Sequence, residues 1–246
     1  MKRLLLMMMV WLFTAITPSF LLCPDRAHPD PPHWIWRLCP DNGHPQFFAF
    51  CPRLLVRENE LQNCLGKIAI QASKYKTLSV NAGAFSQKRS FLSRYLRSID
   101  VEYDQDLAEQ LLSGFVIVRE YSDENGTYMV AKLLAETIDS FLCDTMSNQE
   151  PGSWIDGTIE IEGYYTAIGV ARRRRLLSDS LEASDNNAIF ELSNQISSTI
   201  ASGMNRDHWF GYESIDVQIE GLYILARWAS EDKRYYYSLA VCSKEQ

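Results

Sequence analysis

The stretch GFVIVREYSDENGTYMVA, residues 114–131, decides the fold that the sequence predicts, because a second stretch repeats its plan. GLYILARWASEDKRYYYSLA, residues 221–240, also begins with glycine, places an aromatic residue before a polar turn and returns as an apolar run. Each is typical of two strands joined by a turn, and Asn125-Gly126 is a turn signal in the first. The first strands match at a shift of 107 positions and the second strands at 109. The repetition indicates a duplicated module.

Two further landmarks recur in the same order ahead of these strand pairs. A tryptophan follows a proline-containing approach, at Trp34 and again at Trp154. A short apolar run led by aromatic residues comes next, FFAFC from Phe47 and YYTAIGVA from Tyr164. Each run has the length and composition of a buried strand. We match the two runs from their first residues.

A long helical pattern follows each run, with apolar residues every three or four positions. The stripe of the first pattern consists of Leu61, Leu65, Ile68, Ala72 and Tyr75. The stripe of the second consists of Leu181, Ala188, Leu192, Ile196 and Thr199, with Asp185 off the stripe. Gly83 and Gly203 stand where we expect the two helices to end, because glycine favours the end of a helix.

The whole series predicts an α+β protein of two tandem modules, each a small antiparallel sheet packed on a long helix. We place the first module at residues 32–147 and the second at residues 148–246. A helix over residues 133–146, which ends before a Pro-Gly pair, is expected to close the first module.

Two segments carry clusters of basic residues. Residues 86–98, SQKRSFLSRYLRS, have no counterpart in the second module and are expected to form a short surface helix. An anionic membrane surface or an acidic partner is the alternative contact for that helix. Residues 172–175 are four consecutive arginines, which we expect on a solvated loop between a strand and a helix. Phospholipid head groups or an acidic partner are the alternative ligands of this loop.

The series of tryptophan, aromatic-led strand, apolar-striped helix and glycine-led strand pair resembles a known bacterial plan. The chain is similar to the lipoprotein family that includes the Helicobacter twenty-kilodalton surface lipoprotein, over residues 32–133 and again over residues 153–242. The same module resembles the N-terminal module of flagellar assembly protein T. The resemblance implies a small antiparallel sheet on a long helix, export and frequent lipidation, and it supplies no catalytic residue.

Residues 1–22 have the order of an export signal. Lys2 and Arg3 precede an apolar run from residue 4 to residue 13, and small and polar residues follow. A retained membrane anchor is the alternative, because a spanning helix needs about 20 mostly apolar residues. Residues 23–31 are rich in proline and are expected to form an extended tether.

Three of the six cysteines carry predicted chemistry. Cys23 directly follows the apolar segment, where a bacterial lipoprotein is cleaved and acylated. Leu22 is larger than the residue usual before such a cysteine, and ordinary cleavage after Ser19 is the alternative. Export would place the thiols where disulfides persist, and a disulfide between Cys39 and Cys51 would close a proline-rich loop.

The same region offers ligands for a metal ion. His33 and His44 lie near Cys39 and Cys51, and zinc accepts imidazole and thiolate ligands. Five, four and six residues separate the successive ligands, which matches no tight ligand-pair pattern. We therefore expect no metal and no other cofactor. Two alternatives stay for the cysteines, namely the disulfide between Cys39 and Cys51 and thiols that are free or otherwise paired.

Charge and motifs exclude several classes of function. Without Lys2 and Arg3, the 24 Lys and Arg residues become 22 against 31 Asp and Glu, a formal charge of −9. This charge repels polyanions, so we expect no nucleic acid as a partner. No Gly-x-Ser-x-Gly, phosphate-binding glycine loop or His-Glu-x-x-His motif occurs, and we expect the chain not to be an enzyme.

The sequence thus predicts an exported protein of the bacterial cell envelope, either periplasmic or held at the membrane by a lipid anchor or an uncleaved signal. We expect it to act as a structural, assembly or protein-binding component whose partner is an unknown envelope protein. The alternative is a ligand-binding lipoprotein with an aromatic groove between the two modules. Rings such as Trp34, Trp154, Trp209, Trp228 and Tyr235–Tyr237 could line that groove, although rings along a sheet more often form its core.

Overall fold

The computed structural model describes residues 31–36, 38, 43–89, 92–139, 142, 144–145, 152–155, 159–201 and 211–245. The predicted export signal at residues 1–22 lies outside the described residues, as does the predicted tether at residues 23–31 apart from its last residue. Among the described helices, none is both long enough and apolar enough to cross a membrane.

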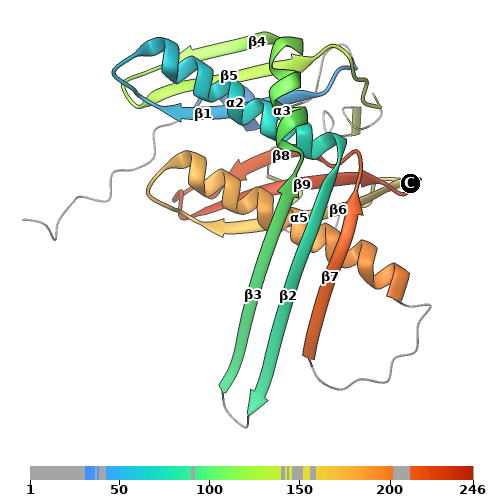
Figure 1. The fold of residues 1–246 in the computed structure, drawn as a ribbon. Coiled ribbons are helices and arrows are strands. Elements are labelled where there is room, and N and C mark those ends of the chain that lie inside the picture. The colour runs from blue at the N-terminus through green and yellow to red at the C-terminus, as the bar shows by residue number, and fades with distance from the viewer. Residues whose placement is uncertain are drawn as a thin grey trace, which may run out of the picture.

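The first module is a three-stranded antiparallel sheet packed against a long helix (Figure 1). Strands β1 (Gln46–Pro52), β5 (Gly126–Leu133) and β4 (Phe115–Ser122) form the sheet in the order β1-β5-β4. Helix α2 (Arg57–Lys76) packs on β1 and β5, and helix α3 (Gln105–Leu111) packs on α2.

The second module repeats this arrangement. Strands β6 (Tyr164–Arg172), β9 (Tyr235–Ser243) and β8 (Tyr223–Ala229) form an antiparallel sheet in the order β6-β9-β8. Helix α5 (Leu177–Ala201) packs on β6 and β9. The predicted α+β class, with small antiparallel sheets packed on long helices, is confirmed.

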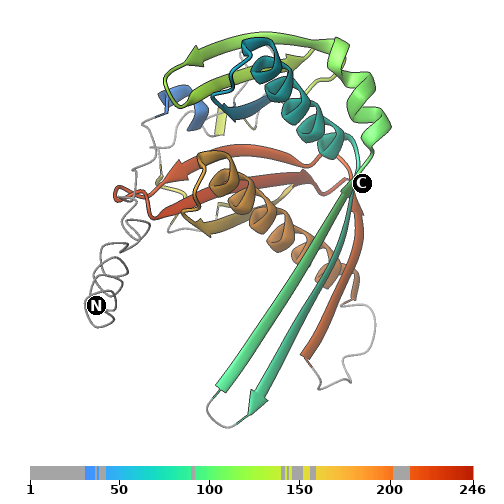
Figure 2. The same ribbon diagram turned by 60° about the vertical axis from the view of Figure 1, so that its left-hand side comes forward.

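The two modules lie one after the other in the same orientation. In Figures 1 and 2 the strands follow one another as β4, β5, β1, β8, β9 and β6, and both long helices lie on the same side of these strands. Edge strand β1 of the first module therefore faces edge strand β8 of the second. The backbone N–H of Leu38 donates to the carbonyl of Leu225 in β8 at 3.5 Å, which ties the chain ahead of β1 to this edge.

The strand registers confirm the duplication. Ile117 of β4 pairs with Ala131, and the register then shifts by a bulge before Arg119. Ile224 of β8 pairs with Ala240, and the same bulge follows. These pairs reproduce the shifts of 107 and 109 positions that the sequence predicts.

The match predicted between the first strands of the two modules is wrong by three residues. Ala131 pairs with Phe47, and its counterpart Ala240 pairs with Ala167, so Phe47 corresponds to Ala167 and not to Tyr164. The true shift is 120 positions, the same as between the two tryptophans. An alignment that starts from the first aromatic residue of each run is wrong, because pairing with the neighbouring strand sets the register.

The shift of 120 positions continues through the loop and helix of each module. Helix α2 begins at Arg57 and α5 begins at Leu177. The N–H of Leu54 donates to Glu60 Oε2 at 2.9 Å, and at the matching place the N–H of Arg174 donates to Ser180 Oγ at 2.8 Å. A side chain of the first helical turn thus satisfies a loop N–H in both modules.

Both predicted apolar stripes lie within these helices, and residues such as Ile68, Ala72 and Leu192 are buried. The predicted end of the first helix is wrong, because α2 ends at Lys76 and Gly83 lies in a strand. The predicted end of the second helix, Gly203, lies outside the described residues.

A third sheet joins the two modules. Strands β2 (Leu78–Arg89), β3 (Leu92–Tyr103) and β7 (Gly211–Ile219) form it in the order β3-β2-β7. The helix predicted over residues 86–98 is therefore wrong, because this segment holds the paired ends of β2 and β3. A short amphipathic run fits helix and strand spacing alike, and the two antiparallel partners of β2 decide in favour of a strand.

The helix predicted over residues 133–146 is also wrong in its first half. Leu133 ends β5, and residues 134–139 form a turn and an irregular segment. The N–H of Leu133 donates to Pro45 O at 3.1 Å, and the N–H of Ile138 donates to Gly43 O at 2.7 Å. These bonds to the approach of β1 replace the bonds that a helix would make within itself.

Candidate functional site

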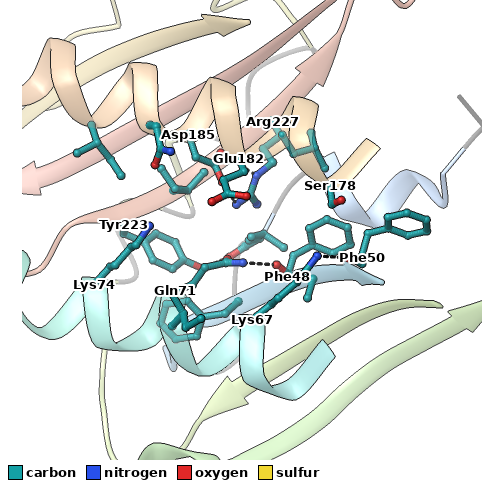
Figure 3. A pocket seen from close by; sticks show the side chains of 18 of the residues that line it. Phe48, Phe50, Lys67, Gln71, Lys74, Ser178, Glu182, Asp185, Tyr223 and Arg227 are labelled. Carbon is teal, nitrogen blue, oxygen red and sulfur yellow. Dashed lines mark hydrogen bonds and ion pairs between the residues drawn. The ribbon is translucent and has the colours of Figure 1, made fainter. Parts of the chain in front are cut away.

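A cleft of about 260 Å³ lies where the two modules meet (Figure 3). Its lining comes mainly from β1 and α2 of the first module and from α5 and β8 of the second. Apolar lining residues include Phe47, Phe48, Phe50, Ile70, Leu181 and Tyr223. Charged lining residues are Lys67, Lys74, Glu182, Asp185 and Arg227. The cleft is therefore mainly apolar and aromatic, with charges on its two helical walls.

Strand β1 and helix α2 form the first wall. Phe48 and Phe50 are two positions apart in β1, so their side chains lie on the same face of the strand. Lys67 Nζ donates to Phe50 O at 3.2 Å, and Gln71 Nε2 donates to Phe48 O at 2.6 Å (Figure 3). These side chains satisfy carbonyls on the edge of β1 that faces the cleft.

Helix α5 and strand β8 form the opposite wall, which holds a buried ion pair. Arg227 Nε lies 3.0 Å from Asp185 Oδ1, and Arg227 Nη2 lies 2.8 Å from Asp185 Oδ2. Ser238 Oγ donates to Asp185 Oδ1 at 2.6 Å. The guanidinium carbon of Arg227 is 5.7 Å from the centre of the Phe48 ring, so the cation also contacts the aromatic part of the first wall.

The third nitrogen of this guanidinium, Nη1, makes no hydrogen bond to the described residues. Only 2% of Arg227 is exposed, and its Nη1 has no hydrogen-bond partner within the part of the chain that the structure describes. Arginine stays protonated in proteins, so Nη1 remains a donor at every ordinary pH. A buried donor without an acceptor costs about 1–3 kcal/mol, which an acceptor oxygen in the cleft would remove.

The remaining cations make the cleft positive. Burial lowers the pKa of Lys74 below its ordinary value of 10.5, and the nearby carboxylates of Glu182 and Asp185 oppose this shift. Asp185 already compensates Arg227 through two hydrogen bonds. Of the remaining charges, Lys67 and Lys74 are positive and only Glu182 is negative. This excess of positive charge favours the binding of an anion.

Tyr223 holds the two modules together beside the cleft. Its hydroxyl lies 2.6 Å from Leu38 O and 2.8 Å from Gln46 O, and the N–H of Gln46 donates to it at 3.2 Å. The Tyr223 ring packs edge-on against Phe47 and Tyr75, with ring centres 6.0 and 6.1 Å away. This hydroxyl is occupied by the backbone, so its role is structural.

A second groove lies at the matching place of the second module, between β6 and α5. Asn187 Nδ2 donates to Val170 O at 2.6 Å, which repeats the bond between Lys67 and Phe50 at a shift of 120 positions. Within the described ranges, no strand closes the groove between β6 and α5 as β8 closes the first cleft.

Cys51, the predicted site residue that the structure describes, does not line the cleft. Cys23 and Cys39 fall outside the described residues, so lipidation and the disulfide between Cys39 and Cys51 stay predictions. Cys51 is a free, buried thiol next to Cys64 in the described chain, and the hydrogen bond between the two thiols lowers the pKa of Cys51. Cys64 Sγ also lies 3.7 Å from Thr127 O.

The two histidines of the predicted ligand region do not gather at a metal site. His33 is exposed in the short 3-10 helix η2 (His33–Trp36), and His44 Nδ1 lies 2.7 Å from Glu136 O. Across the described ranges, no three His, Cys, Asp or Glu side chains are close enough together to hold a metal ion.

The arginine run and the described tryptophans lie outside the cleft. Arg172 ends β6, and residues 173–176 form the predicted loop before α5. Trp154 is buried, and the Trp228 ring centre lies 6.0 Å from that of Trp36. Trp209 lies outside the described residues. None of the tryptophans that the structure describes lines the cleft between the modules.

Sequence reasoning missed the pair of Arg227 and Asp185 and the contribution of Phe48. One signal was present: Arg227 is the single charged residue in the run YILARWA, which otherwise has the composition of a buried strand. A charge within such a run needs a buried partner or a ligand.

Comparison of the chain with protein-family models, with curated proteins and with solved structures finds no match. The resemblance to the lipoprotein family therefore stays a prediction. Function is inferred from the geometry of the cleft.

Proposed function

We propose that the chain binds a small molecule, with an aromatic or apolar body and one anionic group, in the cleft between its two modules. The observation that carries this proposal is Arg227, which lines a mainly aromatic cleft and whose buried Nη1 has no hydrogen-bond partner among the described residues. The chain acts by binding and not by catalysis. This proposal takes up the ligand-binding alternative that the sequence offers.

The size and lining of the cleft define the body of the ligand. About 260 Å³ is slightly below the roughly 300–1,000 Å³ of pockets that hold drug-sized ligands, so a compact molecule fits best. Phe48 and Phe50 offer ring faces on one wall, and Leu181 and Ile70 offer aliphatic surface. Rings favour offset or edge-to-face contacts with other rings, which suits a flat aromatic body.

The charges define the polar end. Arg227 Nη1 can donate to a carboxylate or phosphate oxygen while Nε and Nη2 keep their bonds to Asp185. Lys67 and Lys74 add positive charge across the cleft. A hydrogen bond to a charged group contributes about 1.5–3 kcal/mol, so the anionic group should improve affinity by about tenfold or more.

The test compares matched probes by calorimetry. Indole-3-acetate carries a ring and a carboxylate, and indole-3-acetamide has almost the same shape without the charge. Phenyl phosphate and phenol form a second pair. We expect the anion of at least one pair to bind at least tenfold more tightly than its neutral match. Equal affinity within both pairs, or no binding of either anion to the folded chain, would contradict the proposal.

Variants of α2 locate the binding. Ile70→Trp should fill the cleft and abolish binding without removing a buried polar partner, because Ile70 lines the cleft. Gln62→Trp is the matched control, since Gln62 is exposed on the same helix. Binding that survives Ile70→Trp would place the ligand elsewhere.

We propose, in keeping with the sequence, that this binding takes place in the bacterial cell envelope. Mass spectrometry of the mature N-terminus tests the location: acylated Cys23 supports a lipoprotein, and a start at Phe20 supports a periplasmic protein. An intact Met1 supports a retained anchor.

A structural or assembly role is the second candidate function. Strand β4 favours it, because seven of its eight residues are exposed, including apolar residues on both faces of the strand. An edge strand with apolar residues in solvent is typical of a surface that meets a partner.

A further inference from the structure

We propose that copies of this chain join end to end, with strand β4 of one copy docked against the groove between β6 and α5 of the next. The inference rests on the second candidate function, for which it names a second copy of the chain as the partner. It is independent of the ligand in the cleft.

The contact between the two modules of one chain is the template for this assembly. Strand β8 of the second module lies against β1 and α2 of the first (Figure 1). Tyr223 of β8 bonds to the backbone of Gln46 at the start of β1, and Arg227 of β8 lies over the Phe48 ring. Leu225 between them has no exposed surface.

Strand β4 is the counterpart of β8 in the first module, and its apolar side chains are exposed. Both strands are sheet edges, pair with the returning strand and carry a bulge at the same place. Yet Val116, which corresponds to Tyr223, is 42% exposed, and Ile117 is 45% exposed. Tyr121, which corresponds to Trp228, is 45% exposed as well.

The second module offers the complementary half of the contact. Its groove between β6 and α5 corresponds to the wall that β1 and α2 present to β8. Asn187 and Gln195 of α5 donate to the carbonyls of Val170 and Thr166, as Lys67 and Gln71 of α2 do for β1. Val170 is 45% exposed.

The orientation of the modules identifies the occupant. Because both modules face the same way, the free edge strand of the first and the free groove of the second lie at opposite ends of the series (Figures 1 and 2). One chain therefore cannot bring these two ends together, whereas a second copy can. Such a contact is heterologous, and repeated use of it yields a ring or an open filament.

Two variants block opposite ends of the chain. Val116→Glu places a charge in β4, and Val170→Glu places a charge at the groove between β6 and α5. Both positions are exposed, so each variant should fold as the parent does, which circular dichroism checks. Leu55→Glu is the control, because Leu55 is a fully exposed apolar residue in the loop before α2.

The measurement is sedimentation velocity over a range of concentrations, on the mature protein as it is purified from cells. We expect the parent and Leu55→Glu to form oligomers that grow with concentration. Each blocked variant alone should be monomeric, with its association weakened at least tenfold. A mixture of the two should form a one-to-one dimer and nothing larger, because one intact β4 meets one intact groove.

Three results would overturn the proposal. They are a parent chain that stays monomeric at its highest soluble concentration, oligomers that survive either variant, and a mixture that forms no dimer. The ligand proposal fails separately, because binding of the anionic probes to Val116→Glu should equal binding to the parent. That position lies away from the cleft.

Discussion

Glu60 is a fully buried acidic residue whose surroundings keep it ionised. Its carboxylate accepts the N–H of Leu54 at 2.9 Å and the Thr127 hydroxyl, and Arg57 Nη1 lies 2.5 Å away. Burial alone raises the pKa of Glu60. The hydrogen bonds from Thr127 and Leu54, together with the charges of Arg53 and Arg57, outweigh burial and lower the pKa below its ordinary value of 4.5.

The variant Glu60→Gln should therefore lower the free energy of unfolding near neutral pH by about 1–3 kcal/mol. A depressed pKa in the folded state stabilises the protein above the ordinary pKa, and the gain is lost as the pH falls through the folded pKa. The difference between parent and variant should be complete near pH 7 and should shrink below about pH 4.5. Denaturant titrations at a series of pH values measure it.

Glu58→Gln is the control for this prediction, because Glu58 is exposed and lies two residues before Glu60 on the same helix. It should change the free energy of unfolding by less than about 0.5 kcal/mol. If the loss of unfolding free energy in Glu60→Gln stayed the same at low pH as at pH 7, the charge of the Glu60 carboxylate would contribute nothing to stability.

Single residues of the cleft were the least predictable from the sequence. Asp185 falls off the apolar stripe of its helix, which by pattern alone means a solvated position. It is only partly exposed because Arg227, 42 positions later, folds back onto it. Hydrophobic periodicity reports which face of an element is buried and carries no information on which charges meet across two elements.

Gly169 shows, on the scale of elements, how closely a helix and a strand approach in the second module. A Cβ atom at this position would lie 2.1 Å from Ala188 N and 2.1 Å from Ser184 O, both in the backbone of α5. The corresponding residue of β1 is Ala49, which keeps its methyl group. Helix α5 therefore packs more closely on β6 than α2 does on β1.

Gly169→Ala should lower the free energy of unfolding by about 3 kcal/mol, because a helix backbone has to move to admit the methyl group. Gly66→Ala is the matched control in α2, where a Cβ would meet no atom within 4 Å. It should raise stability by up to about 1 kcal/mol, since alanine favours a helix interior. Urea unfolding of both variants measures the two effects, and equal changes would contradict the packing argument.

Elements with local periodicity were predicted correctly, and elements defined by distant partners were not. The stripes of α2 and α5 and the glycine-led strand pairs each lie within one continuous stretch of sequence. Strand β7 was missed, and residues 86–98 were predicted as a helix. Strand β2 is defined by pairing with β3 on one side and β7 on the other, and local periodicity does not report such pairing. One of those partners is more than a hundred residues away along the chain.

On the scale of the whole molecule, the two modules share their interior. One apolar core contains Phe47 and Ile68 of the first module together with Leu239 of the second. A second core contains Val80 of β2 together with Ile215 of β7. Separate unfolding of the modules would expose both cores, so the chain should unfold as one unit.

Ile219→Ala tests this unity. Ile219 is fully buried in β7 and pairs with Leu78 of β2, so its truncation should cost about 2–5 kcal/mol. Tryptophan fluorescence and far-ultraviolet circular dichroism should give one coincident transition in the parent, shifted as a whole in the variant. Asp216→Ala, at an exposed position of the same strand, should leave the transition in place.

Two transitions, or a shift in one probe alone, would mean that the modules unfold independently. The sequence offered a groove between the modules as an alternative, but it could not say which residues line the cleft, because the cleft forms only where the first module meets the second. The duplication suggested that the two modules share an interface. The shape of the cleft at that interface depends on how residues from both modules pack together.

The ladder between β2 and β7 also sets an order of events for a newly made chain. Strand β2 ends at Arg89, whereas β7 begins at Gly211, so most of the chain has to emerge before the third sheet can close. Until then β2 pairs with β3 alone and leaves one edge unpaired, which is the kind of surface that aggregates. Pairing over such a distance along the chain is slow. Until β7 has been made, β2 therefore needs protection from aggregation, which a chaperone can give.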